Sequence, residues 1–248
     1  MASLADALTR GELVHLRGAV DSDTTASVLD SVWGHLAMRG IQRGQPSTWP
    51  SGAVHHLQPL TRSNVLDALT TDEILGIRSG IVERSTSAGW APLVNFPELG
   101  PVWRVPHRSW HLDEPGRGDP TGHQTARLFV LLSDVQPHGG ATLAVEGSAA
   151  IVRRIVAESD GNDAGSSTKV RLALQRKFEW FGCLMSQRDA CIDARFLDGE
   201  EVEGVFCRVT ELTGAVGDVW CMDQWTLHNA STNTSDTPRL AATYFARE

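Results

Sequence analysis

The first part of the chain alternates apolar and polar residues at helical spacing. The clearest case is 21–40, which opens with capping residues, places apolar residues every three or four positions and ends at a glycine. A weaker version of this pattern covers 63–81. The pattern predicts that residues 1–100 are mostly helical, and we interpret the segments at about 41–60 and 84–108 as loops.

From about residue 101 the pattern changes to short apolar runs that are closed by turn residues. These runs read TARLFVLLSDVQ, GGATLAVEGSA, GVFCRVTEL, GDVWCMDQWTLH and RLAATYFA. The first is apolar without alternation, as in a strand that is buried on both faces. Short strands closed by Gly, Asp, Asn or Pro are typical of a sandwich or barrel. The sequence therefore predicts a mainly β core built from residues 101–149 and 205–248.

Residues 150–204 interrupt this β pattern. The stretch AAIVRRIVAES has helical spacing, and the polar stretch DGNDAGSST follows it. Helical spacing resumes in KVRLALQRKFEWFGCLM. We interpret 150–204 as a helical insertion, or as a lid that closes over one mouth of the barrel and excludes water. The whole chain, 1–248, is expected to form a single domain.

Composition excludes several classes of partner. The 248 residues carry a net charge of −8, whereas nucleic acids and anionic membranes are bound by cationic surfaces. No apolar run approaches the length of a membrane-spanning helix. The four cysteines form no C-x-x-C pair and the first residues lack a signal-peptide pattern, so we expect a cytoplasmic protein. The remaining expectation is a small-molecule substrate; nothing indicates the oligomeric state.

Candidate chemistry begins in the stretch RSWHLDEPG, which contains His111 and Asp113. On a strand, residues i and i+2 point to the same face, so both side chains can reach one point. An imidazole and a carboxylate are two of the three protein ligands of non-haem Fe(II) oxygenases. Alone, H-x-D is a common pattern, and a polar strand end that runs into a turn explains it equally well.

His228 and Arg239 complete the pattern. His228 closes an apolar run, and Arg239 opens the next run eleven residues later. This separation suits a hairpin in which His228 reaches the metal and Arg239 lies deeper in the barrel, where it could hold a carboxylate through two parallel hydrogen bonds. Each residue alone is more often structural, but the conjunction of all four indicates a metal site.

The sequence here resembles the phytanoyl-CoA dioxygenase-like group of Fe(II)/2-oxoglutarate oxygenases. The resemblance rests on WHLD, ARLFVLLSDVQPHGGATLAVEGSA, GDVWCMD and HNASTNTSDTPR, and covers roughly 103–150 and 213–245. It implies a double-stranded β-helix, that is, a jelly-roll or cupin-like fold with N-terminal and inserted helices and with iron at one open end.

The resemblance also implies roles for individual residues. Fe(II) would be bound by His111, Asp113 and His228. Arg239 would bind the distal carboxylate of the co-substrate 2-oxoglutarate, and Thr142 matches a position that often assists. Where related proteins often use serine as a second contact this chain has Ala230, with Ser231 beside it.

The reaction implied is the hydroxylation or desaturation of a small organic substrate by dioxygen, with release of succinate and carbon dioxide. Asp113 occupies the position that halogenases leave open for chloride, which favours these outcomes over halogenation. A role in bacterial secondary metabolism is expected from the composition. Candidate substrate contacts near the motifs are Trp225, Arg104, Arg108 and Arg127. The alternatives are a non-catalytic jelly-roll binding protein and a cupin-type metal enzyme that does not use 2-oxoglutarate.

Overall fold

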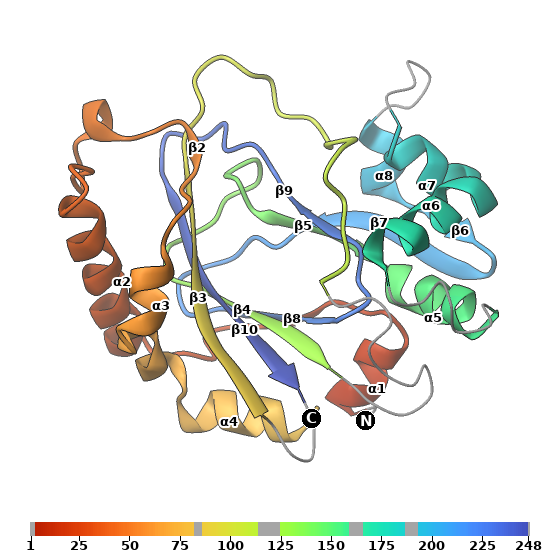
Figure 1. Cartoon of the computed structure of the whole chain (residues 1–248), viewed down its shortest axis with the longest axis horizontal. Coiled ribbons are helices and arrows are strands. Elements are labelled where there is room, and N and C mark those ends of the chain that lie inside the picture. The colour runs from red at the N-terminus through yellow and green to blue at the C-terminus, as the bar shows by residue number, and fades with distance from the viewer. Residues whose placement is uncertain (1–2, 82–85, 114–124, 159–165, 187–192, 248) are drawn as a thin grey trace.

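Two antiparallel sheets face each other, and helices cover the outer face of each (Figure 1). The computed structural model describes residues 3–81, 86–113, 125–158, 166–186 and 193–247. Apolar side chains of both sheets meet between them, as Phe129, Ala144 and Met222 do in one small cluster. The arrangement is a sandwich of two sheets rather than a closed barrel.

Within the part of the chain that the structure describes, the larger sheet has six strands and the smaller has four. The larger sheet contains β1 (Val14–Leu16), β2 (Gly52–Ala53), β3 (Thr86–Phe96), β4 (Ala126–Leu131), β8 (Val219–Asp223) and β10 (Arg239–Arg247), in the order β1-β8-β4-β10-β3-β2. The smaller sheet contains β5 (Thr142–Glu146), β6 (Glu200–Val202), β7 (Val205–Glu211) and β9 (His228–Ala230), in the order β6-β7-β5-β9. All the strand pairings are antiparallel.

Strand β4 shows why the core strands read as unbroken apolar runs. Leu128 and Val130 pack into the cluster that contains the N-terminal helices, whereas Phe129 and Leu131 point between the two sheets. Both faces of the strand are therefore removed from water, and side chains on either face are apolar. The same alternation in β10 places Ala241 between the sheets and its neighbours Leu240 and Ala242 on the helical side.

The N-terminal helices cover the outer face of the larger sheet. They are α1 (Leu4–Thr9), α2 (Ser22–Ala37), α3 (Gln58–Arg62) and α4 (Asp72–Ser79), with short 3-10 turns η1 (Pro46–Thr48) and η2 (Val65–Leu69). The side chain of Asp21 caps α2 by accepting a hydrogen bond from the backbone N–H of Thr24 at 2.8 Å. Val32 and Leu36 of α2 are fully buried in the cluster shared with the sheet.

The prediction of a loop at 84–108 is wrong for 86–96, because these residues form β3, an 11-residue strand that pairs with β10. Its sequence, TSAGWAPLVNF, includes Gly89 and Pro92, two residues that normally weaken a strand pattern. Pairing with β10 along most of its length overrides this local preference, and the N-terminal part of the chain thereby contributes a strand to the larger sheet.

The helices of 150–204 form a second outer layer. They are α5 (Ser148–Glu158), α6 (Ser167–Lys177), α7 (Glu179–Leu184) and α8 (Asp193–Asp198). Val152 of α5 and Phe181 of α7 are buried together with Leu143 and Val145 of β5. Most of the polar stretch DGNDAGSST lies in 159–165, outside the described residues. No helix among the described residues is long and apolar enough to cross a membrane.

Hydrogen exchange tests whether this second layer is a fixed part of the fold or a lid. Because α5 and α7 bury apolar side chains against β5, their amides should exchange as slowly as those of β5 in the protein without metal or substrate. The measurement is exchange followed by peptide-resolved mass spectrometry. Fast exchange throughout α5 and α7 that slows when substrate is added would support the lid interpretation instead.

Candidate metal centre

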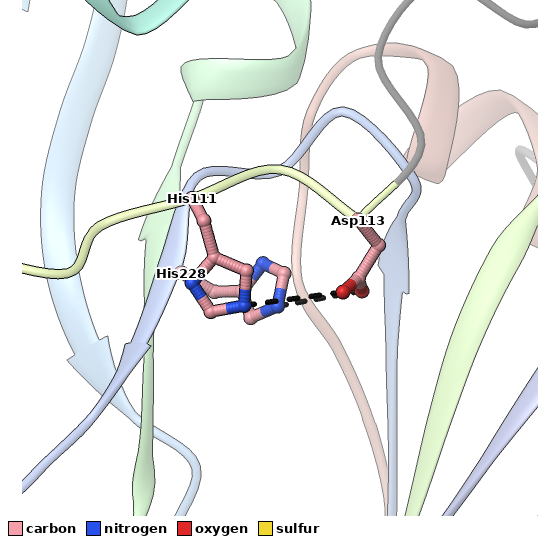
Figure 2. Close-up of side chains that lie close together, drawn as sticks. All are labelled: His111, Asp113 and His228. Atoms are coloured by element: carbon pink, nitrogen blue, oxygen red, sulfur yellow. Dashed lines mark ion pairs between the residues drawn. The ribbon is translucent and has the colours of Figure 1, made fainter. Parts of the chain in front are cut away.

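Two histidines and one aspartate converge on one point. Their ligand atoms all lie within 4.8 Å of one another, and Figure 2 shows the three side chains pointing to one place. His111 and Asp113 come from an irregular segment, whereas His228 begins β9. The backbones of the two histidines are joined by an isolated antiparallel bridge, with N–H···O distances of 3.0 and 3.1 Å in the two directions.

The side chains of residues 111–113 alternate in direction as expected for H-x-D, although an isolated bridge at His111 replaces a regular strand pairing. Leu112 is buried in the apolar cluster of the smaller sheet, so His111 and Asp113 face the opposite way. Its backbone N–H is also fixed, because it donates to the side chain of Ser167 at the start of α6, at 3.0 Å.

The distances fit a shared ion. Asp113 Oδ1 lies 3.9 Å from His111 Nε2, and Asp113 Oδ2 lies 3.3 Å from His228 Nε2. Two donors that bind one ion at about 2 Å each can be no more than about 4 Å apart. Both carboxylate–imidazole distances meet this limit.

The tautomers of the two histidines also suit metal binding. Nδ1 of His111 lies 2.9 Å from the carbonyl oxygen of Ser109, and Nδ1 of His228 lies 2.9 Å from that of Thr226. Because a carbonyl oxygen can only accept, each Nδ1 carries a proton and donates it, and Nε2 is the ring nitrogen that remains to face the centre. Burial, together with the nearby His228, lowers the pKa of His111 and keeps its ring neutral.

The carboxylate of Asp113 is held in its charged form. Burial alone would raise its pKa, but a hydrogen bond with His228 and the charges of His228 and Arg127 outweigh burial, and the pKa falls well below its usual range. Arg127 donates to Asp113 Oδ2 through Nη1 and to Thr243 Oγ1 through Nε at 2.8 Å. The donor set is thus two imidazoles and one carboxylate.

Arg239 lies between the sheets without a counter-charge. Its side chain is buried, and among the described residues no carboxylate pairs with it. Burial lowers its pKa to about 10, which leaves it charged at neutral pH. Its Nη2 donates to Thr142 Oγ1 at 2.8 Å, while Nε has no partner. A buried guanidinium in this state is unfavourable unless an anion joins it.

One cavity joins Arg239 to the metal ligands. It has a volume of about 240 Å³, and its lining includes His111, Asp113, His228, Arg239 and Thr142. The apolar part of its wall includes Leu93 and Phe129. All five predicted ligand and co-substrate residues therefore lie around one space.

The route by which the chain brings His228 and Arg239 together differs from the expected hairpin. β9 pairs with β5 in the smaller sheet, whereas β10 pairs with β3 and β4 in the larger one. The connection crosses between the sheets and is held by the buried Asn233, whose side chain donates to the backbone of Asn95 at 3.1 Å and of Thr237 at 2.8 Å. The hairpin prediction is wrong, because the two residues face each other across the sandwich.

The candidate substrate contacts lie mostly elsewhere. Trp225 is fully buried outside the cavity, with its ring 4.6 Å from the guanidinium carbon of Arg153. The side chain of Arg104 is 75% exposed and lies 3.6 Å from Asp193. Arg108 lines a different cavity, described below. Arg127 is the one of these three candidate arginines that lines the metal cavity.

The cavity wall also contains polar residues that the motifs did not indicate. Asn95 of β3 is opposite Arg239 in the register of β10, and its side-chain oxygen is buried without a partner. Asn229 and His55 line the same space. Ser231 is not part of the wall, since its hydroxyl donates to the carbonyl of Ala141 at 2.9 Å.

Comparison with known proteins gives a fold rather than a sequence family. No protein-family model matches the sequence, and no curated protein matches it. Among solved structures, the epimerase SnoN in complex with Fe3+, alpha ketoglutarate and nogalamycin RO is similar with a TM-score of 0.59 and 19% identity, over 99% of this chain and 82% of SnoN.

Two further structures agree. The alpha ketoglutarate dependent carbocyclase SnoK from nogalamycin biosynthesis has a TM-score of 0.55 and 17% identity, over 100% of this chain and 84% of SnoK. HygX from Streptomyces hygroscopicus, with nickel and 2-oxoglutarate bound, has a TM-score of 0.52 and 14% identity, over 96% of this chain and 83% of HygX. The chain therefore has the jelly-roll fold of non-haem, 2-oxoglutarate-dependent proteins, and the predicted fold class is confirmed.

Proposed function

We propose that the protein is an Fe(II)/2-oxoglutarate-dependent dioxygenase that hydroxylates or desaturates a small organic substrate and releases succinate and carbon dioxide. The observation that carries the proposal is a cavity that joins three metal-type ligands to a buried arginine for which the described residues supply no counter-charge. The iron, when bound, supplies the reaction of dioxygen and 2-oxoglutarate that oxidises a C–H bond.

The residues of the chain have separate tasks in this proposal. His111, Asp113 and His228 hold Fe(II) through Nε2 atoms and a carboxylate whose orientation is fixed before the metal binds. Arg239 and Thr142 bind the distal carboxylate of 2-oxoglutarate, which supplies the missing counter-charge. Leu93 and Phe129 exclude water from the space between them.

Single observations favour the finer parts of the proposal. Asp113 fills the carboxylate position, which favours hydroxylation or desaturation over halogenation. The short motifs favour a phytanoyl-CoA dioxygenase-like affiliation. SnoK is described as an enzyme of nogalamycin biosynthesis, which favours a role in bacterial secondary metabolism. The free, buried Cys183, Cys207 and Cys221 favour a cytoplasmic location.

A succinate assay tests the proposal against its alternatives. The protein is incubated with Fe(II), ascorbate and 2-oxoglutarate, and succinate is measured with and without candidate substrates. We expect succinate release that requires iron and that N-oxalylglycine inhibits by competing with 2-oxoglutarate. Iron binding without 2-oxoglutarate binding would favour the cupin-type metal enzyme, and binding of neither would favour the non-catalytic jelly-roll protein.

A further inference from the structure

A second cavity lies behind the segment that carries His111. It has a volume of about 200 Å³ and lies between residues 107–110 and α6. Its lining includes His107, Arg108, Ser109, Trp110, Arg171 and Gln175. None of these residues lines the metal cavity, and none of the described residues around the second cavity is acidic.

The charge of this second cavity is unusual for this chain. Acidic residues outnumber Lys and Arg by 30 to 22, and several arginines pair with carboxylates, as Arg127, Arg195 and Arg208 do. Arg108 and Arg171 share the cavity, and neither has a carboxylate within ion-pair distance among the described residues. Two guanidinium groups that line one concave space without an acid attract an anion.

The wall of the second cavity is fixed in place. The backbone oxygen of Arg108 accepts from the side chain of Asn229 at 2.6 Å, and that of Trp110 accepts from Arg171 Nη1 at 3.3 Å. The side chain of Gln175 donates to the backbone of Met185 at 3.0 Å, which holds α6 to the end of α7. These contacts occupy one of the five N–H donors of Arg171 and leave the others for a ligand.

We propose that this second cavity binds an anionic group, a phosphate in the first place, between the guanidinium groups of Arg108 and Arg171. Guanidinium groups bind phosphate oxygens through paired, charge-assisted hydrogen bonds. The group is either inorganic phosphate or a phosphate substituent of the substrate. A phosphate substituent of the substrate rests on the proposed function. The structure supports this source, because Asn229 lines the metal cavity and also contacts the wall of the second cavity.

The test is a calorimetric titration of the full chain with inorganic phosphate, without iron or 2-oxoglutarate and at constant ionic strength. We expect saturable binding at one site. Arg108→Gln and Arg171→Gln should each weaken binding about tenfold or more, equivalent to about 1.4 kcal/mol. The matched control is Arg176→Gln, which removes the same charge from an exposed position of α6 outside the cavity and should leave binding unchanged.

The outcomes separate this proposal from the proposed function. Absence of saturable binding, or an equal loss in Arg176→Gln, would overturn the anion site whatever the succinate assay gives. A second titration with methyl phosphate identifies the source. Binding as tight as that of inorganic phosphate indicates a substituent of the substrate, whereas much weaker binding indicates the free ion. Thermal unfolding of each variant confirms that the substitutions at these exposed or half-buried positions leave the fold intact.

Discussion

We expect His228→Ala to abolish iron-dependent succinate release while the chain remains folded. The substitution removes the Nε2 donor, and two ligands of a three-ligand site remain. His228 is bridged to His111 through backbone N–H and C=O groups, which alanine retains, so β9 can still pair with β5. Loss of a whole ligand should weaken iron binding by more than the roughly 10–100-fold typical of losing a group that only orients a ligand.

The measurement is Fe(II) titration followed by the succinate assay at saturating iron, with circular dichroism to verify folding. His138→Ala is the matched control, because His138 is half exposed and lies outside the metal cavity. Wild-type-like activity of His228→Ala with iron restored would remove His228 from the proposed triad.

We expect Arg239→Ala to raise the 2-oxoglutarate requirement by roughly two to four orders of magnitude, because breaking the proposed desolvated ion pair would cost about 3–5 kcal/mol. Arg239→Lys should be intermediate, since an ammonium offers a point charge instead of a planar fork. Iron affinity should barely change, because Arg239 donates to Thr142 and is not one of the metal-type ligands.

The unfolding midpoint adds a second signature for Arg239. Without 2-oxoglutarate, the buried guanidinium has no carboxylate partner among the described residues, so its removal should not greatly destabilise the protein. Added 2-oxoglutarate should raise the midpoint of the wild type and not of Arg239→Ala. The control is Arg104→Ala, at an exposed position outside the cavity. Equal 2-oxoglutarate affinity in Arg239→Ala and wild type would favour a cupin-type enzyme that does not use this co-substrate.

The placement of His111 and Asp113 on one side of the chain follows from a local rule. His111 and Asp113 share a face because Leu112 between them is apolar and buried. Residues two apart in an extended stretch of backbone face the same side, so this information is local.

The polar wall of the cavity could not be predicted in the same way. Asn95 lies on β3, whose glycine and proline weaken the strand pattern in the sequence. It reaches the cavity because β3 pairs with β10. Trp225, three residues before His228, points into the apolar layer under α5 instead of into the cavity. The segment between β8 and β9 is too irregular for spacing to predict the direction of a side chain.

The sequence by itself determined the mainly β class and most of the elements, though not β3, because these follow from apolar spacing and turn residues over short distances. Only the tertiary structure decided that His228 and Arg239 belong to opposite sheets, that Arg127 holds Asp113, and that the carbonyls of Ser109 and Thr226 fix the two imidazoles. These contacts depend on where the chain crosses between the sheets and which strands pair, and local spacing does not encode either.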